Sequence, residues 1–137
     1  MDRTAAQAWL DAYVEAWKSY DRSQVEALFA EDATYRYHPY DPEAETLHGR
    51  DEIVSSWLEP DGNASSRDAE GTYEAYYEAY AVDGERVVAV GTSTYYPDTT
   101  RATPERVYDN VFLIEFDGAG RCRSFTEYFM KQPDAEG

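Results

Sequence analysis

Apolar residues recur with a helical period near the start of the chain and alternate, as in β-strands, through its second half. Trp9, Tyr13 and Trp17 fall on one helical face, which predicts a first helix that ends near residue 20. Thr4 and Gln7 have the spacing of a capping box at its start. Three helices are expected in all, over about residues 4–20, 21–29 and 51–58.

Alternation of apolar and polar positions predicts five strands. Asp83-Gly84 is a strong two-residue turn signal, so we expect the second and third strands to form a hairpin. The last two strands flank a glycine-rich turn in which Gly118 and Ala119 are the expected loop residues. The predicted strands cover residues 33–40, 72–82, 85–96, 106–116 and 121–130.

The last hairpin places polar side chains among aromatic ones. With Gly118 and Ala119 as the loop, Asn110 is expected opposite Glu127. The same register pairs Phe112 with Phe125 and Tyr108 with Phe129. A carboxylate between two phenylalanines must meet a donor, hold a proton or face a cavity, because burying it ionised and unpaired costs several kcal/mol, roughly. This pattern indicates a site.

In the hairpin before it, Tyr77 and Ala79 are expected on the core face together with Val88 and Val90. The opposite face carries an aromatic patch, formed by Tyr76, Tyr80 and Val87 among acidic residues. An exposed apolar patch of this kind favours a homodimer through that sheet face.

The chain has 137 residues, enough for one core, and the expected organisation is a single domain over 1–132 followed by an acidic tail, 133–137. A net charge of −16 makes nucleic acid and acidic membranes poor partners. The N-terminal residues lack the apolar core of a signal peptide, no run is long enough to span a bilayer, and Cys122 is the only cysteine. These features predict a cytoplasmic protein.

Four stretches of the chain resemble the SnoaL-like branch of the nuclear transport factor 2-like (NTF2-like) superfamily. They are Ala16 to Asp21, Leu28 to Ala33, His48 to Ile53 and Phe125 to Phe129. The resemblance implies an α+β fold of the cystatin/NTF2-like type: a cone in which three N-terminal helices pack into a strongly curved, mostly antiparallel sheet. An apolar pocket opens at one end of such a cone.

Relatives of this kind include polyketide cyclases, ketosteroid isomerases, limonene epoxide hydrolases and dehydratases, besides proteins that only bind or dimerise. The resemblance therefore implies a small-molecule pocket protein, and an isomerase, cyclase or dehydratase that needs no cofactor. Epoxide hydrolysis of the limonene type is disfavoured, because Val90 to Tyr95 lack the Arg and Asp that it needs.

Three residues are candidates for the chemistry. Glu127 occupies the acidic place in the Arg-Asp/Glu-Tyr-Phe run of the epoxide hydrolases, with Thr126 in place of the Arg, and a raised pKa would suit it to acid/base work. His38 lies at a strand end, where it could reach the cone mouth as a base. Asn110 could stabilise an oxyanion together with a tyrosine such as Tyr37. The expected substrate-binding residues are Tyr13, Trp17, Tyr37, Trp57, Tyr108, Phe112 and Phe129.

Each candidate also has a structural interpretation. Glu127 could be a buried residue tied to Asn110 or to a tyrosine, His38 could be a cap or a surface residue, and the aromatic residues could fill the cone. The chain would then be a non-catalytic ligand-binding or dimerisation module. No metal is expected, because the two histidines with Asp41 or Glu45 have no recognised ligand spacing.

Overall fold

The computed structural model describes residues 1–19, 21–58, 73–97, 100 and 103–133. Three helices and four long strands confirm the expected α+β order. The first half of the chain forms α1 (Arg3–Ser19), α2 (Arg22–Leu28), β1 (Phe29–Arg36), the 3-10 helix η1 (Glu43–Glu45), β2 (Leu47–His48) and α3 (Arg50–Leu58). The second half forms β3 (Tyr73–Asp83), β4 (Arg86–Tyr95), β5 (Arg106–Phe116) and β6 (Cys122–Lys131).

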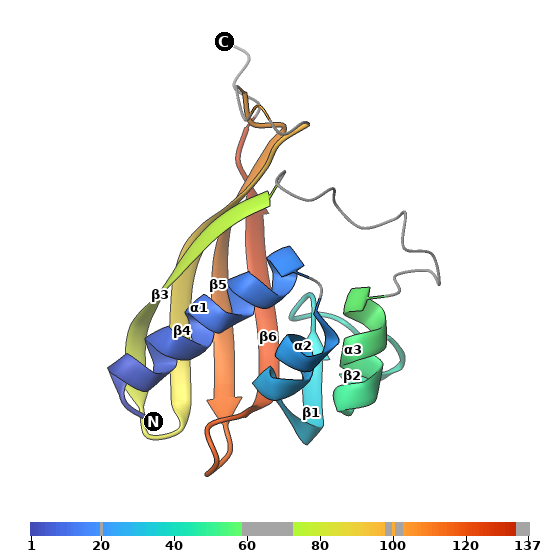
Figure 1. Ribbon diagram of the computed structural model, residues 1–137, viewed down its shortest axis with the longest axis vertical. Coiled ribbons are helices and arrows are strands. Elements are labelled where there is room, and N and C mark those ends of the chain that lie inside the picture. Colours follow the sequence, from blue (N-terminus) through green and yellow to red (C-terminus); the bar gives the residue numbers. More distant parts are fainter. Residues whose placement is uncertain (20, 59–72, 98–99, 101–102, 134–137) are drawn as a thin grey trace.

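One six-stranded sheet runs in the order β2-β1-β6-β5-β4-β3. Only β1 and β6 pair in parallel, so the sheet is mostly antiparallel. The sheet curves around α1, and all three helices lie on its concave side (Figure 1). Because no described helix covers the convex face, side chains there face away from the core.

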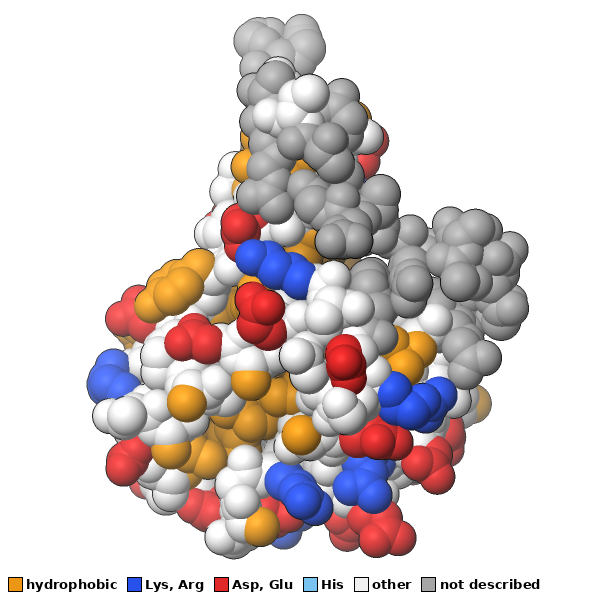
Figure 2. All heavy atoms as spheres, in the orientation of Figure 1, with side chains coloured by type: hydrophobic (Ala, Val, Ile, Leu, Met, Phe, Trp, Pro, Cys, Tyr) orange, Lys and Arg blue, Asp and Glu red, His pale blue; other side chains and the backbone are white. Residues whose placement is uncertain are grey.

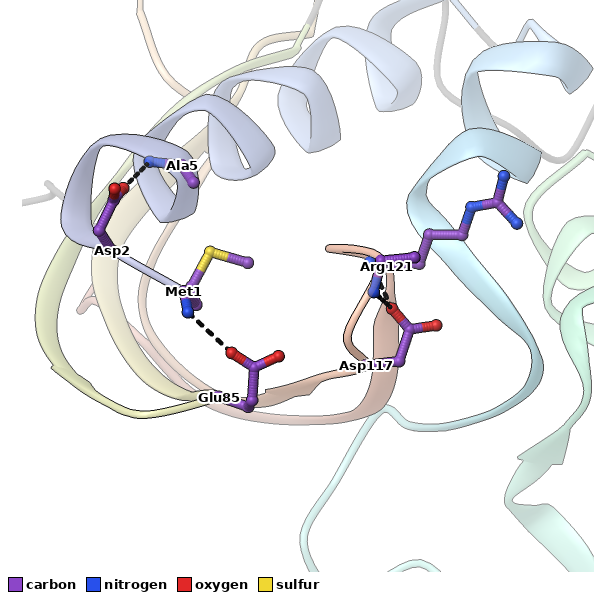
Figure 3. A network of polar contacts seen from close by, with 7 residues as sticks. Met1, Asp2, Ala5, Glu85, Asp117 and Arg121 are labelled. Atoms are coloured by element: carbon purple, nitrogen blue, oxygen red, sulfur yellow. Dashed lines mark hydrogen bonds and ion pairs between the residues drawn. The ribbon is translucent and has the colours of Figure 1, made fainter.

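Helix α1 starts differently from the sequence prediction. The cap is Asp2, whose carboxylate accepts a hydrogen bond from the backbone N–H of Ala5 at 2.8 Å (Figure 3). Gln7, expected in a capping box, instead bonds to the backbone of β3: it donates to the carbonyl of Tyr77 and accepts from the N–H of Ala79. This amide therefore fixes the first helix to an edge strand. Asp21 caps α2 as predicted.

The β3–β4 hairpin has a different register from the predicted one. Its turn is Gly84-Glu85, and a β-bulge lies between Ala79 and Ala81. A bulge inserts one residue into one strand, which reverses the faces of everything beyond it relative to the partner strand. Tyr77 and Ala79 face the core as expected, but they pair with Gly91 and Ala89 on β4 rather than with Val90 and Val88. Val87 was predicted on the exposed patch and is buried.

The β5–β6 hairpin also departs from its predicted register. The backbone N–H of Asp117 donates to the carbonyl of Arg121, so the loop has three residues, 118–120, and Gly120 has a φ of +83°. The carboxylate of Asp117 accepts from the N–H of Arg121 (Figure 3) and also from the N–H of Ala119. A second irregularity leaves Arg123 unpaired, because Phe116 pairs with Cys122 and Glu115 with Ser124.

Together the longer loop and the bulge shift the pairing by two residues, so each side chain keeps its predicted face. Glu127 lies opposite Phe112, and Asn110 lies opposite Phe129. The predicted pairs Asn110–Glu127, Phe112–Phe125 and Tyr108–Phe129 are therefore wrong, although the face they share is right.

Strand β1 begins at Phe29, directly after α2, and ends at Arg36, whereas the sequence predicted residues 33–40. The predicted loop over 59–71 and part of the one over 97–104 lie outside the described residues. Acidic side chains are scattered over the helix-bearing face, as the net charge of −16 leads one to expect (Figure 2).

Candidate functional site

A cavity of about 310 Å³, here called the inner cavity, opens at the end of the concave face where β1 stops and β5 begins. Seven of the ten residues predicted for catalysis or binding line it: Trp17, Tyr37, His38, Tyr108, Asn110, Glu127 and Phe129. They come from α1, from the segment that follows β1, and from β5 and β6. The volume suits a small ring compound rather than a macromolecule.

Glu127 is the most unusual residue of this cavity. Burial raises the pKa of its carboxyl from 4.5 to about 7. Asn110 does not hydrogen-bond to it, and no other residue in the described part of the chain contributes a hydrogen bond or an ion pair to this carboxylate. A carboxyl group in this state can give or take a proton near neutral pH.

The carboxylate lies close to the buried tyrosines of the cone. Burial raises the pKa of Tyr77 to about 12, and the negative charge of Glu127 contributes to the rise. The pKa values of Tyr13 and Tyr35 are raised well above their usual value by burial, with smaller contributions from Glu127. The hydroxyl groups of Tyr13 and Tyr35 hydrogen-bond to each other at 2.9 Å, so they stay protonated and paired. Glu127 is thus the group of this cluster that titrates near neutrality.

Asn110 is 4% exposed and bonded to neutral hydroxyl groups. Its amide nitrogen donates to Ser93 Oγ at 2.9 Å and to the hydroxyl of Tyr77 at 3.3 Å. The structure therefore replaces the predicted Asn110–Glu127 bond by bonds to β4 and β3. An amide has two N–H donors, so both are used in this arrangement.

His38 lies beyond the end of β1 and lines the inner cavity. Its Nδ1 is 3.0 Å from Oδ1 of Asp41. Tyr40 stacks on the imidazole with ring centroids 5.0 Å apart, and Phe129 lies at 5.3 Å. The ring is therefore held on several sides.

Three predicted binding residues do not reach the cavity. Tyr13, Trp57 and Phe112 are at most 2% exposed and pack in the core. Tyr13 stacks on Phe125 with centroids 5.4 Å apart, and Phe112 lies 4.5 Å from Tyr77. Trp57 is separated from solvent by Trp17, which stacks on it at 4.2 Å. The cone below the cavity is filled by its own aromatic side chains.

Sequence reasoning missed three cavity residues, which are Ser93, Tyr95 and Arg106. Ser93 and Tyr95 share the inner face of β4 with Ala89 and Gly91. The faces of β4 were misassigned because the bulge on β3, which has no sequence signal, changes which residues of β4 face the core. With the correct assignment both residues would have been expected inside. Arg106 packs over the ring of Tyr95, with its guanidinium carbon 4.4 Å from the centroid.

A second, more open depression of about 740 Å³ lies beside the first, and we call it the outer groove. His38, Asn110, Glu127 and Phe129 line both depressions. The outer groove continues over the convex face of β4, β5 and β6, where Val111, Tyr128 and Met130 are exposed. The two depressions meet at the candidate acid/base residues.

Two further findings concern only the described part of the chain. No group of three or more His, Cys, Asp or Glu side chains is close enough to hold a metal ion. No helix there is both long and apolar enough to cross a membrane. The metal-free site and the cytoplasmic location stay predictions.

A family model described as a SnoaL-like domain matches residues 10–125. No curated protein matches the chain. A solved NTF-2 like protein of unknown function from Burkholderia xenovorans LB400 is similar, with a TM-score of 0.65 and 18% identity over 98% of this chain and 89% of that one.

Two further solved structures share the fold. A protein of unknown function with a cystatin-like fold from Methylobium petroleophilum PM1 has a TM-score of 0.61 and 21% identity, over 100% of this chain and 82% of that one. A candidate ketosteroid isomerase from Kribbella flavida DSM 17836 has a TM-score of 0.63 and 14% identity, over 99% and 85%. These likenesses confirm the cystatin/NTF2-like architecture.

Proposed function

Because this chain belongs to the SnoaL-like domain family, we propose that its inner cavity binds a small, apolar, carbonyl-bearing molecule and that Glu127 moves a proton on it. The reaction would be that of an isomerase, cyclase or dehydratase and would need no cofactor. One observation carries the proposal: a cavity carboxyl group without a described partner has a pKa of about 7.

Proton abstraction from carbon next to a carbonyl needs a base that is ionised and poorly solvated. Glu127 meets both needs above neutral pH, because desolvation is the cause of its raised pKa. The aromatic walls formed by Trp17, Tyr108 and Phe129 would hold a flat apolar ring. The enolate formed at the carbonyl oxygen then requires a hydrogen-bond donor.

We assign that donor role to Asn110 and to the hydroxyl of Tyr37. Asn110 would exchange one of its bonds, to Ser93 or Tyr77, for a bond to the ligand oxygen. Tyr37 lies within 3.0 Å of Ser56 Oγ, so its hydroxyl is held at the cavity wall from the side of α3. Both groups are neutral hydrogen-bond donors of the kind that stabilises a developing oxyanion.

The proposal can be tested without the natural substrate. 2-Tetralone is an apolar bicyclic ketone whose α-protons exchange with D₂O once a base removes them, and ¹H NMR follows the exchange. We expect the protein to accelerate exchange and Glu127→Gln to abolish the acceleration. Glu78→Gln, which changes an exposed carboxylate on β3, is the matched control and should exchange as the wild type does. Equal rates for wild type and Glu127→Gln would contradict the proposal.

A non-catalytic binding module is the second candidate, because Tyr13, Trp57 and Phe112 fill the deep part of the cone. In that case 2-tetralone or a related ketone would raise the melting temperature by binding the native state, without any exchange. The same experiment thus separates the two functions.

We also propose that the protein is a homodimer through the convex face of the sheet. The sequence predicted Tyr76 and Tyr80 on this exposed face, and they are 63% and 65% exposed there. Val111, Leu113, Tyr128 and Met130 extend the apolar surface over β5 and β6, and together the six residues form what we call the convex patch. In register, Met130 pairs with Asp109, Asp109 with Thr92 and Thr92 with Tyr76, so the patch spans four adjacent strands. A second copy would meet the same patch in a two-fold arrangement.

A further inference from the structure

The segment that follows β1 holds a histidine and an aspartate in a fixed arrangement at the cavity mouth. His38 and Asp41 are joined by three hydrogen bonds. Oδ1 of Asp41 lies 3.0 Å from Nδ1 of His38, and Oδ2 accepts from the backbone N–H of His38 at 3.2 Å. The backbone N–H of Asp41 in turn donates to the carbonyl of His38 at 3.2 Å.

The aspartate of this pair is nearly removed from solvent, while the histidine is open to the cavity. The side chain of Asp41 is 8% exposed and that of His38 is 35% exposed. An ionised carboxylate only accepts hydrogen bonds, so the proton between the two side chains belongs to Nδ1 of the imidazole. The lone pair of the neutral ring is then on Nε2, to which no residue in the described ranges is bonded.

We propose that Asp41 is a positioning residue that makes His38 a second proton-handling group of the inner cavity, separate from Glu127. The inference rests on the proposed function and deepens it. With Nε2 as the free atom, His38 takes a proton from a substrate oxygen or returns one to it. Glu127 and His38 both line the inner cavity and the outer groove, so a ligand at their junction can meet both.

Two separate proton-handling groups favour substrates that carry a hydroxyl or carbonyl oxygen beside the acidic C–H bond. In such a step the C–H bond breaks, its proton goes to the Glu127 carboxylate, and its electron pair forms the C=C bond of an enol. The π electrons of the C=O bond move to the oxygen, which takes the Nε2 proton of the His38 imidazolium, so charge and atoms balance within the site. Ketonisation runs the same transfers in reverse.

Several other ionisable groups lie around His38 and contribute to any pH dependence. In the inner cavity they are Tyr37, Tyr95, Arg106, Tyr108 and Glu127, and in the outer groove they are Tyr40, Asp109 and Tyr128. The test therefore uses the position of the imidazole proton rather than a pH profile alone.

The first measurement is the tautomer of His38 by ¹⁵N NMR, which needs no ligand. We expect the neutral ring of the wild type to carry its proton on Nδ1 and Asp41→Ala to shift it toward Nε2. The control is Glu43→Gln, which breaks the other His–carboxylate contact, the one with His48 at 3.0 Å, outside both depressions. It should leave the His38 signals unchanged. The proposal would be overturned if the wild-type ring carried its proton on Nε2. It would also be overturned if Asp41→Ala and the wild type had the same tautomer.

The second measurement is the exchange of 2-tetralone at saturating ketone. We expect Asp41→Ala and His38→Gln each to lower the rate roughly tenfold or more with little change in affinity, and Asp41→Ala to cost nothing further in the His38→Gln background. Independent losses in the double variant would mean that Asp41 does not act through His38.

If Asp41→Ala does not fold, Asp41→Asn keeps an acceptor for Nδ1 and should retain the tautomer while exchanging 2-tetralone more slowly. If Glu127→Gln exchanges 2-tetralone as fast as the wild type, the proposed function is refuted. The tautomer of His38 would still stand as a separate result.

Discussion

Phe112 and Glu127 are direct partners across the β5–β6 ladder, and the ring of Phe112 lies 4.7 Å from Phe125 and 4.5 Å from Tyr77. The carboxyl group of Glu127 therefore lies beside a cluster of aromatic rings, and this cluster provides no positive charge. Ionising it costs free energy in the folded state, which is the physical origin of a pKa of about 7.

The first prediction concerns stability against pH. A rise in the pKa from 4.5 to about 7 corresponds to roughly 3 kcal/mol of unfolding free energy. A raised carboxyl pKa means that the folded state binds the proton more tightly, so this contribution is present below about pH 4.5 and is lost as the pH rises to about 7. Glu127→Gln mimics the protonated form and should be more stable than the wild type by roughly 2–3 kcal/mol at pH 8 and equal to it at pH 4.5. Urea unfolding at both pH values checks this, and equal stability at pH 8 would contradict it.

The second prediction concerns the catalytic pH profile. Since Glu127 must be ionised to take a proton from carbon, exchange of 2-tetralone should rise as the pH increases from 5 through about 7. A profile that is flat between pH 5 and 9, after subtraction of the buffer rate, would assign the base elsewhere.

The third prediction concerns Asn110, which joins β5 to two neighbouring strands through Ser93 and Tyr77. Asn110→Ala removes both bonds and should destabilise the protein by about 1–3 kcal/mol, because buried hydroxyl groups lose their partner. Ser93→Ala removes one of the two bonds and should cost less. Thermal unfolding of both variants gives the order, and a larger loss for Ser93→Ala would show that the hydroxyl network does not depend on the amide.

The sequence predicts which face of the sheet a side chain occupies only where two errors in the predicted strand register cancel. In β5–β6 the three-residue loop shifts the pairing by one residue and the bulge at Arg123 shifts it by another, so Asn110 and Glu127 keep their predicted face. In β3–β4 the turn and the bulge at Tyr80 leave a net shift of one residue, so Val87 moved from the predicted surface into the core. A bulge depends on tertiary packing rather than on local composition, and nothing near Tyr80 announces it.

The candidate site was predictable for a related reason. Glu127 is the acidic residue on an otherwise aromatic strand face, and that property survives a shift of two residues. The other residues of the site do not follow from the pattern: Asp41, which contacts His38, lies in a loop, and Ser93 and Tyr95 lie on a strand whose parity was misassigned. Tyr13, Trp57 and Phe112 were expected at the cavity because aromatic residues at helical or strand spacing serve cores and pockets alike, and only packing separates the two uses.

The fourth prediction concerns Gly91, where β4 passes close to β3 beside Asn110. A Cβ atom there would lie 2.1 Å from the carbonyl oxygen of Tyr76 and 2.5 Å from the Tyr77 ring. Gly91→Ala should therefore force the two strands apart, destabilise the protein by more than about 2 kcal/mol and disturb the Asn110–Tyr77 bond. Gly118→Ala, at a loop position with nothing within 4 Å, is the matched control and should be nearly neutral. Similar melting temperatures for the two variants would show that the strands can separate at this point.

The last prediction concerns assembly. All described helices lie on the concave side of the sheet, so none of them covers the convex patch (Figure 1). We expect light scattering to give twice the mass of one chain for the wild type. Leu113→Glu and Tyr80→Glu each place a charge in the patch, and both should shift the mass toward that of a monomer, because a buried unpaired carboxylate costs several kcal/mol, roughly. Ala12→Glu makes the same change in charge on the exposed face of α1 and should leave the dimer intact. A dimer that survives both patch variants but dissociates in Ala12→Glu would place the interface on the helical layer instead.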